Sequence, residues 1–289
     1  MLLTFTKGHG TENDFVLLYD PTGEIKLSDT LVRWLCDRRA GIGGDGVIRA
    51  VLAGSLPEGE GLDPATWYMD YWNSDGSLSE MCGNGARVFA ALLETFAGLD
   101  LSSGLGIATR GGPRELLALG DGNYRVGMGP WSVAATTNGT DAVVSTRGLA
   151  PRPALSVDVG NPHSVVALAS LDELDGLDLT VAPSVDPVPP NGSNVEFVVP
   201  LGETSVAGER RGVVRMRVHE RGSGETRSCG TGAVAAALAV RAWAGPSSPS
   251  VWDVYVPGGL VTVRVADDSA SLEGPAVLVA RGEVDVPLA

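Results

Sequence analysis

The sequence predicts an α/β protein of the α+β kind with two pseudo-symmetric halves, each a curved, mostly antiparallel sheet or barrel around a central helix. The segment 82–86, Cys-Gly-Asn-Gly-Ala, returns 147 residues later at 229–233 as Cys-Gly-Thr-Gly-Ala. Each copy opens an apolar run of helical length, and each run ends at a glycine, Gly98 or Gly245. Short alternating segments separated by glycine-rich turns fill the rest of both halves, as in sheet proteins.

In the first half, Ser28 is a suitable N-cap for a helix over 29–38, with Gly41 beyond its end. The polar segment 54–63 is expected to be a hairpin or an insertion. A second helix is expected over 87–97, directly after the first cysteine turn. Alternating or apolar runs predict strands at 2–7, 15–19, 47–52 and 67–72.

The second half repeats this plan, with a helix expected over 234–244 after the second cysteine turn. Residues 130–152 contain few segments with a clear hydrophobic periodicity, so we place the domain boundary there. The expected domains are 1–131 and 132–275. Strands are expected at 154–160, 164–169, 194–199, 213–219, 251–256 and 260–265.

Composition excludes several classes of function. The formal net charge of −14 argues against nucleic acid and against anionic membrane surfaces, because phosphates require a basic face. No apolar stretch approaches the length of a membrane span, and the first residues do not resemble a signal peptide. Three cysteines in 289 residues do not form a disulfide framework, so we expect a cytoplasmic protein.

The two cysteine turns carry the chemistry that the sequence suggests. A cysteine at a helix N-terminus is favoured as the thiolate, because the first backbone N–H groups and the helix dipole attract negative charge. The same groups can seat a carboxylate. The donors here are the amides around Gly83, Asn84, Gly230 and Thr231. We therefore expect an active site in a cleft between the halves, with one thiol on each face of a carbon that is inverted.

Several further motifs accompany the two cysteine turns along the chain. They are 13–15 (Asn-Asp-Phe), 73–76 (Asn-Ser-Asp-Gly), 81–87, 161–163 (Asn-Pro-His), 194–197 (Asn-Val-Glu-Phe) and 220–232. With these motifs the chain is similar to diaminopimelate epimerase over nearly its whole length and in the family's order. The resemblance implies PLP-independent conversion of LL-diaminopimelate to meso-diaminopimelate, on the route to lysine and peptidoglycan, with no cofactor and no metal. It also implies that a final strand within 276–289 crosses back to the N-terminal domain.

By this resemblance Cys82 and Cys229 are the two proton carriers, one thiolate and one thiol. Because cysteine pairs titrate together, their protonation belongs to the pair. The guanidinium of Arg221 suits the distal carboxylate of the substrate, and Glu220 can receive its ammonium. His163 and Glu220 are expected to assist proton movement beside the thiols. The remaining substrate-binding candidates are Asn13, Asn73, Asn161 and Asn194, together with the helix-turn residues Gly83, Asn84, Gly230 and Thr231.

One position departs from the family pattern, and several alternatives stay open. Gly46 stands where many members carry glutamine, so one substrate contact is missing or is supplied otherwise. Asn13 could simply shape its turn, and Glu220 with Arg221 could be an ordinary surface pair. Cys36 lies on an apolar helical stripe and is expected to be a core residue.

Three rival functions remain at the level of sequence. A proline or hydroxyproline racemase would share the two thiols but would not need the polar residues of the distal cage. A thiol redox protein would more naturally show a Cys-x-x-Cys pair. A non-catalytic binder of small molecules would not need matched thiols. The expected partner is a small-molecule substrate, and we also expect a homodimer.

Overall fold

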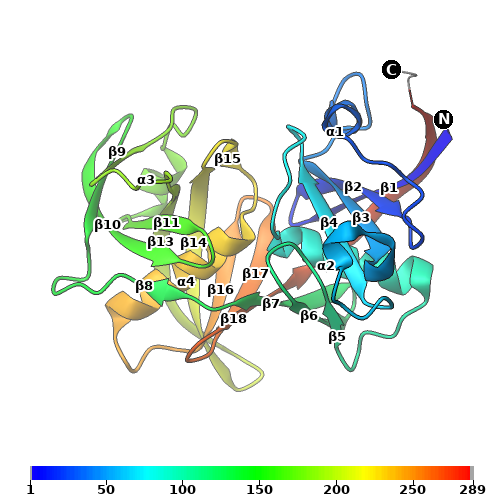
Figure 1. Ribbon diagram of the computed structural model, residues 1–289. Coiled ribbons are helices and arrows are strands. Elements are labelled where there is room, and N and C mark those ends of the chain that lie inside the picture. Colours follow the sequence, from blue (N-terminus) through cyan, green and yellow to red (C-terminus); the bar gives the residue numbers. More distant parts are fainter. Residues whose placement is uncertain (1, 287–289) are drawn as a thin grey trace. The chain divides into compact units, whose positions relative to one another are not determined.

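The chain is an α+β protein in which strands far outnumber helices (Figure 1). The computed structural model describes residues 2–286. Internal contacts divide the chain into two compact units, unit 1 (Met1–Val126 with Gly274–Ala289) and unit 2 (Gly127–Glu273). The chain therefore enters unit 2 once and returns once. The corresponding boundaries expected from the sequence lie after residues 131 and 275.

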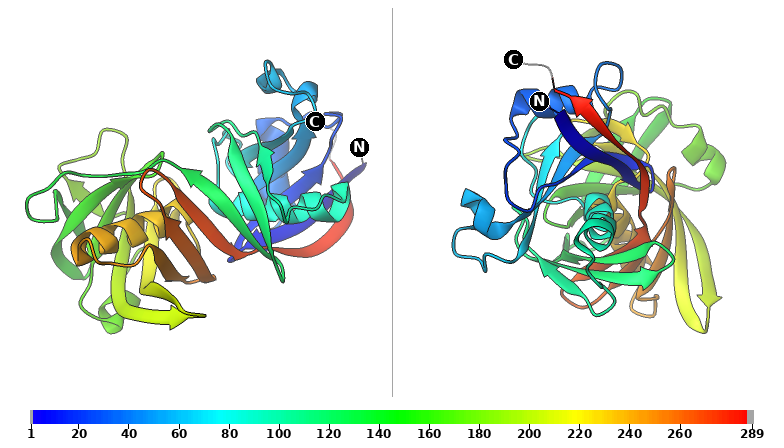
Figure 2. Two further views of the ribbon diagram at one scale, coloured as in Figure 1. Left: turned by 90° about the horizontal axis from the view of Figure 1, so that it is seen from below. Right: turned by 90° about the vertical axis from the view of Figure 1, so that its right-hand side faces the viewer.

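Unit 1 is organised around a five-stranded sheet in the order β19-β1-β2-β3-β4. Neighbouring strands run antiparallel except β2 and β3, which run parallel. The last strand of the chain pairs with the first, and Figure 2 shows the two side by side, red beside dark blue. The strands are β1 (Leu2–Gly10), β2 (Asn13–Tyr19), β3 (Gly46–Leu52), β4 (Trp67–Asn73) and β19 (Val277–Asp285).

The helix α1 (Asp29–Cys36) packs against β2 and β3, and the Ser28 hydroxyl caps its N-terminus as the sequence predicts. The helix ends two residues earlier than expected. Asp37 adopts extended backbone angles, and its carboxylate accepts the amides of Arg39 and Ala40. Where the sequence allowed a hairpin or an insertion, two single 3₁₀ turns occur, η1 (Ala53–Ser55) and η2 (Pro57–Gly59).

The central helix of unit 1 is α2 (Gly83–Leu92), and all ten of its residues are buried. It contacts β1, β2, β3, β6 and β19. The helix continues into the π-helical turn η3 (Leu93–Ala97), and Gly98 ends it in the left-handed conformation (φ 65°) that favours glycine. An antiparallel meander follows, made of β5 (Leu105–Ile107), β6 (Arg114–Gly120) and β7 (Asn123–Gly129).

Unit 2 carries a longer sheet in the order β12-β9-β10-β11-β13-β14-β16-β17-β18, with β8 on β10 and β15 on β14. Its central helix α4 (Gly230–Ala244) contacts β10, β11, β13, β14, β16 and β17. A short helix, α3 (Leu171–Asp175), has no counterpart among the elements predicted from the sequence. The strands are β8 (Ser132–Val133), β9 (Ala142–Thr146), β10 (Leu149–Asp158), β11 (Pro162–Ala167), β12 (Ser184–Asp186), β13 (Asn194–Val206), β14 (Glu209–Glu220), β15 (Gly224–Thr226), β16 (Val251–Val256), β17 (Gly259–Val265) and β18 (Ala270–Pro275).

The two units repeat one topology. The strands β1-β2-β3-β4 pair as antiparallel, parallel, antiparallel, and β10-β11-β13-β14 do the same. Ile48 lies between Leu17 and Tyr71 in the first sheet, and Glu196 lies between Val165 and Val218 in the second. Ile48 and Glu196 therefore occupy matching positions. Within the described residues neither sheet closes on itself, so each unit has the curved sheet that the sequence predicts rather than the alternative, a barrel.

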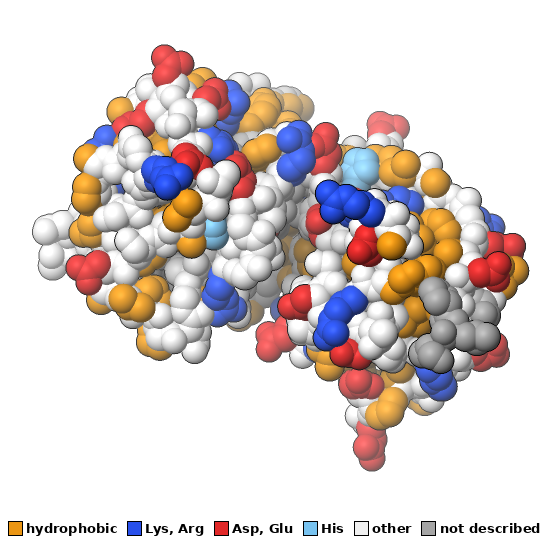
Figure 3. Space-filling view, turned by 90° about the horizontal axis from the view of Figure 1, so that it is seen from above, with side chains coloured by type: hydrophobic (Ala, Val, Ile, Leu, Met, Phe, Trp, Pro, Cys, Tyr) orange, Lys and Arg blue, Asp and Glu red, His pale blue; other side chains and the backbone are white. Residues whose placement is uncertain are grey.

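On the side drawn in Figure 3, acidic and basic side chains are interspersed on both units, and the described residues form no broad basic area there. Between residues 2 and 286, no helix is both long enough and apolar enough to cross a membrane.

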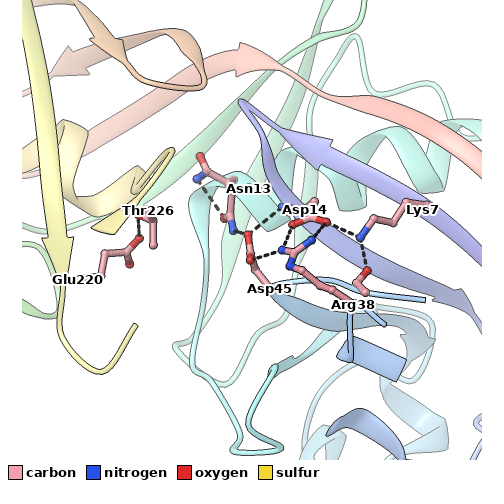
Figure 4. Close-up of polar contacts among 9 residues, drawn as sticks. Lys7, Asn13, Asp14, Arg38, Asp45, Glu220 and Thr226 are labelled. Carbon is pink, nitrogen blue, oxygen red and sulfur yellow. Dashed lines mark hydrogen bonds and ion pairs between the residues drawn. The ribbon is translucent and has the colours of Figure 1, made fainter. Parts of the chain in front are cut away.

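A charged network in unit 1 ties β1, β2 and the loop after α1 together (Figure 4). Asp14 accepts hydrogen bonds from Lys7 and from both terminal nitrogens of Arg38, at 3.0 and 2.7 Å. Arg38 also donates to Asp45 at 2.7 Å. Burial alone would raise the pKa of Asp14, but the bonds from Arg38 and Lys7 outweigh it and lower that pKa to about 2.

We expect the variant Asp14→Asn to destabilise unit 1 by about 2 kcal/mol at pH 7. The folded protein lowers this pKa below its value of 3.8 in a free chain. The stabilisation is therefore complete above that value and is lost as the pH falls towards 2. Hydrogen exchange of peptides from residues 2–19, followed at pH 7, 4 and 3, measures the difference.

The exposed pair of Asp29 and Arg33 provides a matched control, because it also joins a carboxylate to a guanidinium. From the same exchange rates, we expect Asp29→Asn to change the free energy of unfolding by less than about 0.5 kcal/mol. A difference between Asp14→Asn and the wild type that stays constant from pH 7 to pH 3 would contradict the charge-based explanation.

Candidate functional site

The first cysteine turn forms the start of α2. Cys82 is its N-cap, with extended backbone angles, and the Cys82 sulfur accepts the amide of Gly85 at 3.4 Å. A Cβ atom at Gly85 would lie 2.8 Å from Ile48 Cδ1 and 3.1 Å from Met69 Cε. Because glycine has no Cβ, the first turn of the helix rests directly on the sheet. The sequence predicted a helix start at Arg87, four residues too late, since it did not anticipate a cap made by sulfur.

Two asparagine side chains surround the thiol of Cys82. The thiol donates to Asn13 Oδ1 at 3.6 Å, and Asn84 Nδ2 donates to the same oxygen at 3.2 Å. On its other side, Asn13 Nδ2 donates to Asp45 Oδ2 at 2.7 Å (Figure 4). A carboxylate only accepts, so Asp45 fixes the amide group of Asn13 with its oxygen towards the thiol.

A buried arginine lies one turn further along α2. Arg87 has no exposed surface, and its Nη2 donates to Asn84 Oδ1 at 3.0 Å and to Thr11 Oγ1 at 3.1 Å. Burial lowers the pKa of Arg87 to about 10, and a negative charge on Cys82 opposes that effect. Among the described residues, Arg87 has no carboxylate partner. It therefore places a positive charge behind the first thiol turn, a feature that the sequence analysis missed.

Asn73 lies apart from these contacts, at the end of β4. Its Nδ2 donates to the hydroxyl of Ser77 at 3.0 Å, and its backbone pairs with Gly46. Asn73 is thus held at the end of the strand next to β3, where its side chain remains half-buried.

The second cysteine turn has the same backbone arrangement. Cys229 is the N-cap of α4, and its sulfur accepts the amide of Gly232 at 3.3 Å and lies 3.6 Å from the Thr231 hydroxyl. The sequence again placed the helix start four residues too late, at Val234. Cys229 is buried, and burial raises the pKa of its thiol well above the ordinary value. The charges of Glu220 and Glu196 raise that pKa further.

Glu220 lies near this thiol, and its charge raises the pKa of Cys229. Its carboxyl group accepts a hydrogen bond from the hydroxyl of Thr226 (Figure 4). Burial raises the pKa of Glu220, and hydrogen bonding with Thr226 and Cys229 partly offsets the rise. The carboxyl is therefore near the sulfur, as a group that assists proton movement must be, and it is not paired with Arg221.

His163 is held by oxygen atoms on both sides of its ring. Nδ1 lies 2.7 Å from Glu196 Oε1, and Nε2 lies 2.9 Å from Asn161 Oδ1. The Nδ2 atom of Asn161 donates a hydrogen bond to Thr231 Oγ1 at 3.4 Å. The structure thus brings together His163, Asn161 and Thr231, three of the residues selected from the sequence. It adds Glu196, which the sequence analysis quoted within a motif but gave no role.

Asn194 and Arg221 lie together at the end of β14. Asn194 Oδ1 accepts the backbone amide of Arg221 at 2.9 Å, and its Nδ2 donates to Pro162 O at 3.3 Å. The guanidinium of Arg221 donates to the carbonyl oxygen of Asn191 and is exposed. Within residues 2–286 it has no carboxylate partner, so the surface pair with Glu220 that the sequence left open does not form.

Cys36 is a core residue, as the sequence predicts. It packs with Val32 and Leu35 among the apolar residues under α1. Burial raises the pKa of its thiol to about 12. Nowhere among residues 2–286 do three histidine, cysteine or acidic side chains gather closely enough to hold a metal ion.

Each half-site therefore offers a thiol at a helix N-terminus, the backbone amides of the first helical turn, and nearby polar side chains. This arrangement can hold a carboxylate and move a proton at the adjacent carbon. The surroundings of the two thiols differ. Amides and a buried cation surround Cys82, whereas two carboxyl groups approach Cys229.

Comparison with known structures supports the fold. A phenazine biosynthesis protein of the PhzF family from Bacillus anthracis matches 99% of this chain and 100% of its own, with a TM-score of 0.68 and 14% identity. A hydroxyproline epimerase from Agrobacterium vitis matches 98% of this chain and 91% of its own, with a TM-score of 0.60 and 16% identity. At such identities the likeness shows the shared two-domain fold.

Sequence comparison is more specific. The model of the diaminopimelate epimerase family matches residues 5–134 and 155–285. The diaminopimelate epimerase of Streptomyces coelicolor is 46% identical over 98% of this chain and 96% of its own length. The corresponding enzyme of Thermobifida fusca is 43% identical, with 98% of both chains covered. The chain belongs to the diaminopimelate epimerase family and is an amino-acid epimerase.

Proposed function

We propose that this protein converts LL-diaminopimelate to meso-diaminopimelate by a two-base mechanism in which Cys82 and Cys229 act on opposite faces of one α-carbon. The observation that carries the proposal is the repetition of a thiol as a helix N-cap in matching positions of two units. Inversion of a stereocentre needs one proton acceptor and one proton donor, and two thiols supply both.

The roles of the two thiols follow from their surroundings. Burial and the neighbouring carboxyl groups raise the pKa of Cys229, so this thiol keeps its proton and starts as the acid. In a two-base mechanism Cys82 then starts as the thiolate and removes the α-proton. After one turnover the proton distribution is exchanged, which is the starting state for the reverse direction.

Negative charge that develops on the substrate needs preorganised donors. The α-carboxylate can take up the charge while the backbone amides of Gly83, Asn84, Gly230 and Thr231 donate to it. The reaction as proposed uses no cofactor, because proton transfer and charge stabilisation are both supplied by the chain. Glu220, which lies near Cys229, assists the proton on that side.

The distal end of the substrate explains the choice of diaminopimelate over proline or hydroxyproline. Arg221 presents an exposed guanidinium next to Asn194, which suits a second carboxylate. Glu220 can receive the distal ammonium, and Asn13, Asn73 and Asn161 complete the polar cage. A ring amino acid has no distal group that would use these residues.

The proposal extends to the cellular setting. The product serves lysine and peptidoglycan synthesis, and we place the enzyme in the cytoplasm as a homodimer. Support comes from the acidic composition and the small number of cysteines. Size-exclusion chromatography with light scattering tests the dimer.

Deuterium incorporation tests the reaction. We expect the wild-type protein, reduced and in D₂O, to convert LL-diaminopimelate to the meso form with deuterium at the inverted α-carbon. Cys82→Ala and Cys229→Ala should each lower the rate by roughly 10²–10⁴-fold or more, because each removes the proton carrier on one face. Proton NMR and mass spectrometry follow the exchange.

Cys36→Ala is the matched control, because it removes a core thiol from the same chain, and its rate should stay close to the wild-type value. Turnover of L-proline or hydroxyproline with none of diaminopimelate would refute the proposed substrate. Full activity of either of the other two variants would refute the two-base mechanism.

The exposed guanidinium of Arg221 generates a second prediction. Arg221→Ala should lower kcat/KM by the equivalent of roughly 2–5 kcal/mol, since it removes a charged partner of the distal carboxylate. It should lower kcat as well as raise KM, because remote binding orients the reacting centre. Arg221→Lys should restore part of the loss, since an ammonium cannot reproduce the planar fork.

Arg210→Ala is the control for this measurement. Arg210 lies near the start of β14, far along the strand from Arg221, and forms an exposed pair with Glu203 of β13. The steady-state kinetics of this control should match the wild type. If the kinetics of Arg221→Ala match those of the wild type, Arg221 does not bind a distal carboxylate. That outcome would favour a smaller substrate.

A further inference from the structure

Glu196 is a charged-for-apolar difference between the two repeats. The matching residue in unit 1 is Ile48, an apolar side chain suited to its buried position. Glu196 is also completely buried, near the start of β13. Burial of a carboxyl group at a position that suits an apolar side chain destabilises the fold unless a hydrogen-bond or ion-pair partner compensates.

The carboxyl lies directly under the second thiol turn. A Cβ atom at Gly232 would be 2.8 Å from Glu196 Oε1 and 3.2 Å from the Cys229 sulfur. The carboxylate oxygen and the sulfur are therefore no farther apart than the sum of those two distances. At this range a buried negative charge strongly disfavours a second one on the sulfur.

The same carboxyl also sets the position of a ring. Oε1 lies 2.7 Å from His163 Nδ1, while Oε2 has no hydrogen-bond partner among the described residues. The other ring nitrogen of His163 faces Asn161 Oδ1. A proton on Nδ1 then donates to the Glu196 carboxylate, which fixes the orientation of the ring.

We propose that Glu196 is a positioning residue for the second half-site: as a buried carboxylate it keeps the proton on Cys229 and fixes the orientation of the His163 ring. This inference deepens the proposed two-thiol reaction and rests on it. Glu196 itself touches neither sulfur nor substrate, so its effect is exerted through Cys229 and His163.

Several groups of unit 2 act on the thiol of Cys229. Glu220 and Glu196 disfavour the thiolate, whereas the Gly232 amide and the Thr231 hydroxyl favour it. Glu196 raises the pKa of the neighbouring Glu220, whereas His163 lowers it. Removing the charge of Glu196 therefore leaves Glu220 as the remaining acidic group beside the sulfur.

Thiol alkylation tests the proposal without any substrate. Wild-type protein and Glu196→Gln are treated with iodoacetamide across a range of pH, and each cysteine is followed separately by mass spectrometry. Trypsin cleavage after Arg227 and Arg241 isolates Cys229 from Cys82. Glutamine keeps the size of the side chain and an acceptor for His163 Nδ1, so the substitution removes mainly the charge.

In Glu196→Gln we expect the pH midpoint for alkylation of Cys229 to fall by about one unit, with the Cys82 midpoint unchanged. Glu203→Gln, which removes a carboxylate from the exposed end of the same strand, should shift neither. Superimposable profiles of Cys229 in wild type and Glu196→Gln would overturn the proposal. So would an equal shift of both cysteines, which indicates general loosening.

A second measurement uses the unmodified protein, so the proposal is testable even if the variant fails to fold. The chain has three histidines, and long-range proton–nitrogen NMR spectra resolve their rings. His163 Nδ1 should carry the proton that it donates to Glu196. An unprotonated Nδ1 would show that Glu196 is the protonated partner and would overturn the proposal. Neither measurement depends on diaminopimelate, so its outcome is separate from a failure of the proposed substrate.

Discussion

Both half-sites depend on one steric constraint, the absence of a side chain at the third residue of each thiol helix. Gly85 and Gly232 let the first turn of α2 and α4 rest on the sheet below at distances that any Cβ would violate. This contact places the sulfur of the N-cap cysteine beside a particular side chain of the neighbouring strand. Whatever residue occupies that strand position therefore influences the thiol directly, whether it is Ile48 or Glu196.

On this common frame the two thiols have different charged groups around them. In unit 1 the cation Arg87 orients Asn84, and the anion Asp45 orients Asn13. The residue that matches Arg87 in α4 is Val234, which is buried and apolar. Unit 2 instead gathers Glu196 and Glu220 around its thiol. Similar backbones thus surround two sulfurs whose electrostatic environments differ.

The sequence allowed the fold to be predicted wherever one face of an element is buried. Alternating residues located the main strands, and Ser28 and Gly98 marked the ends of helices. The starts of α2 and α4 were wrong by a turn, because a sulfur cap leaves no signal in patterns of oxygen-containing caps. The short helix α3 has too few residues for a periodic pattern to be recognised.

Candidate site residues could be selected from the sequence when their chemistry was repeated or charged, as for Cys82, Cys229 and Arg221. Arg87 and Glu196 escaped, because a sequence does not show which charged residues are buried, and an isolated charged residue is ordinarily read as solvent-exposed. Asp45 is only partly buried, and it escaped because the sequence does not show its hydrogen bond to Asn13. In the proposed reaction, unequal surroundings give one sulfur a preference for the proton, whereas identical surroundings would leave none.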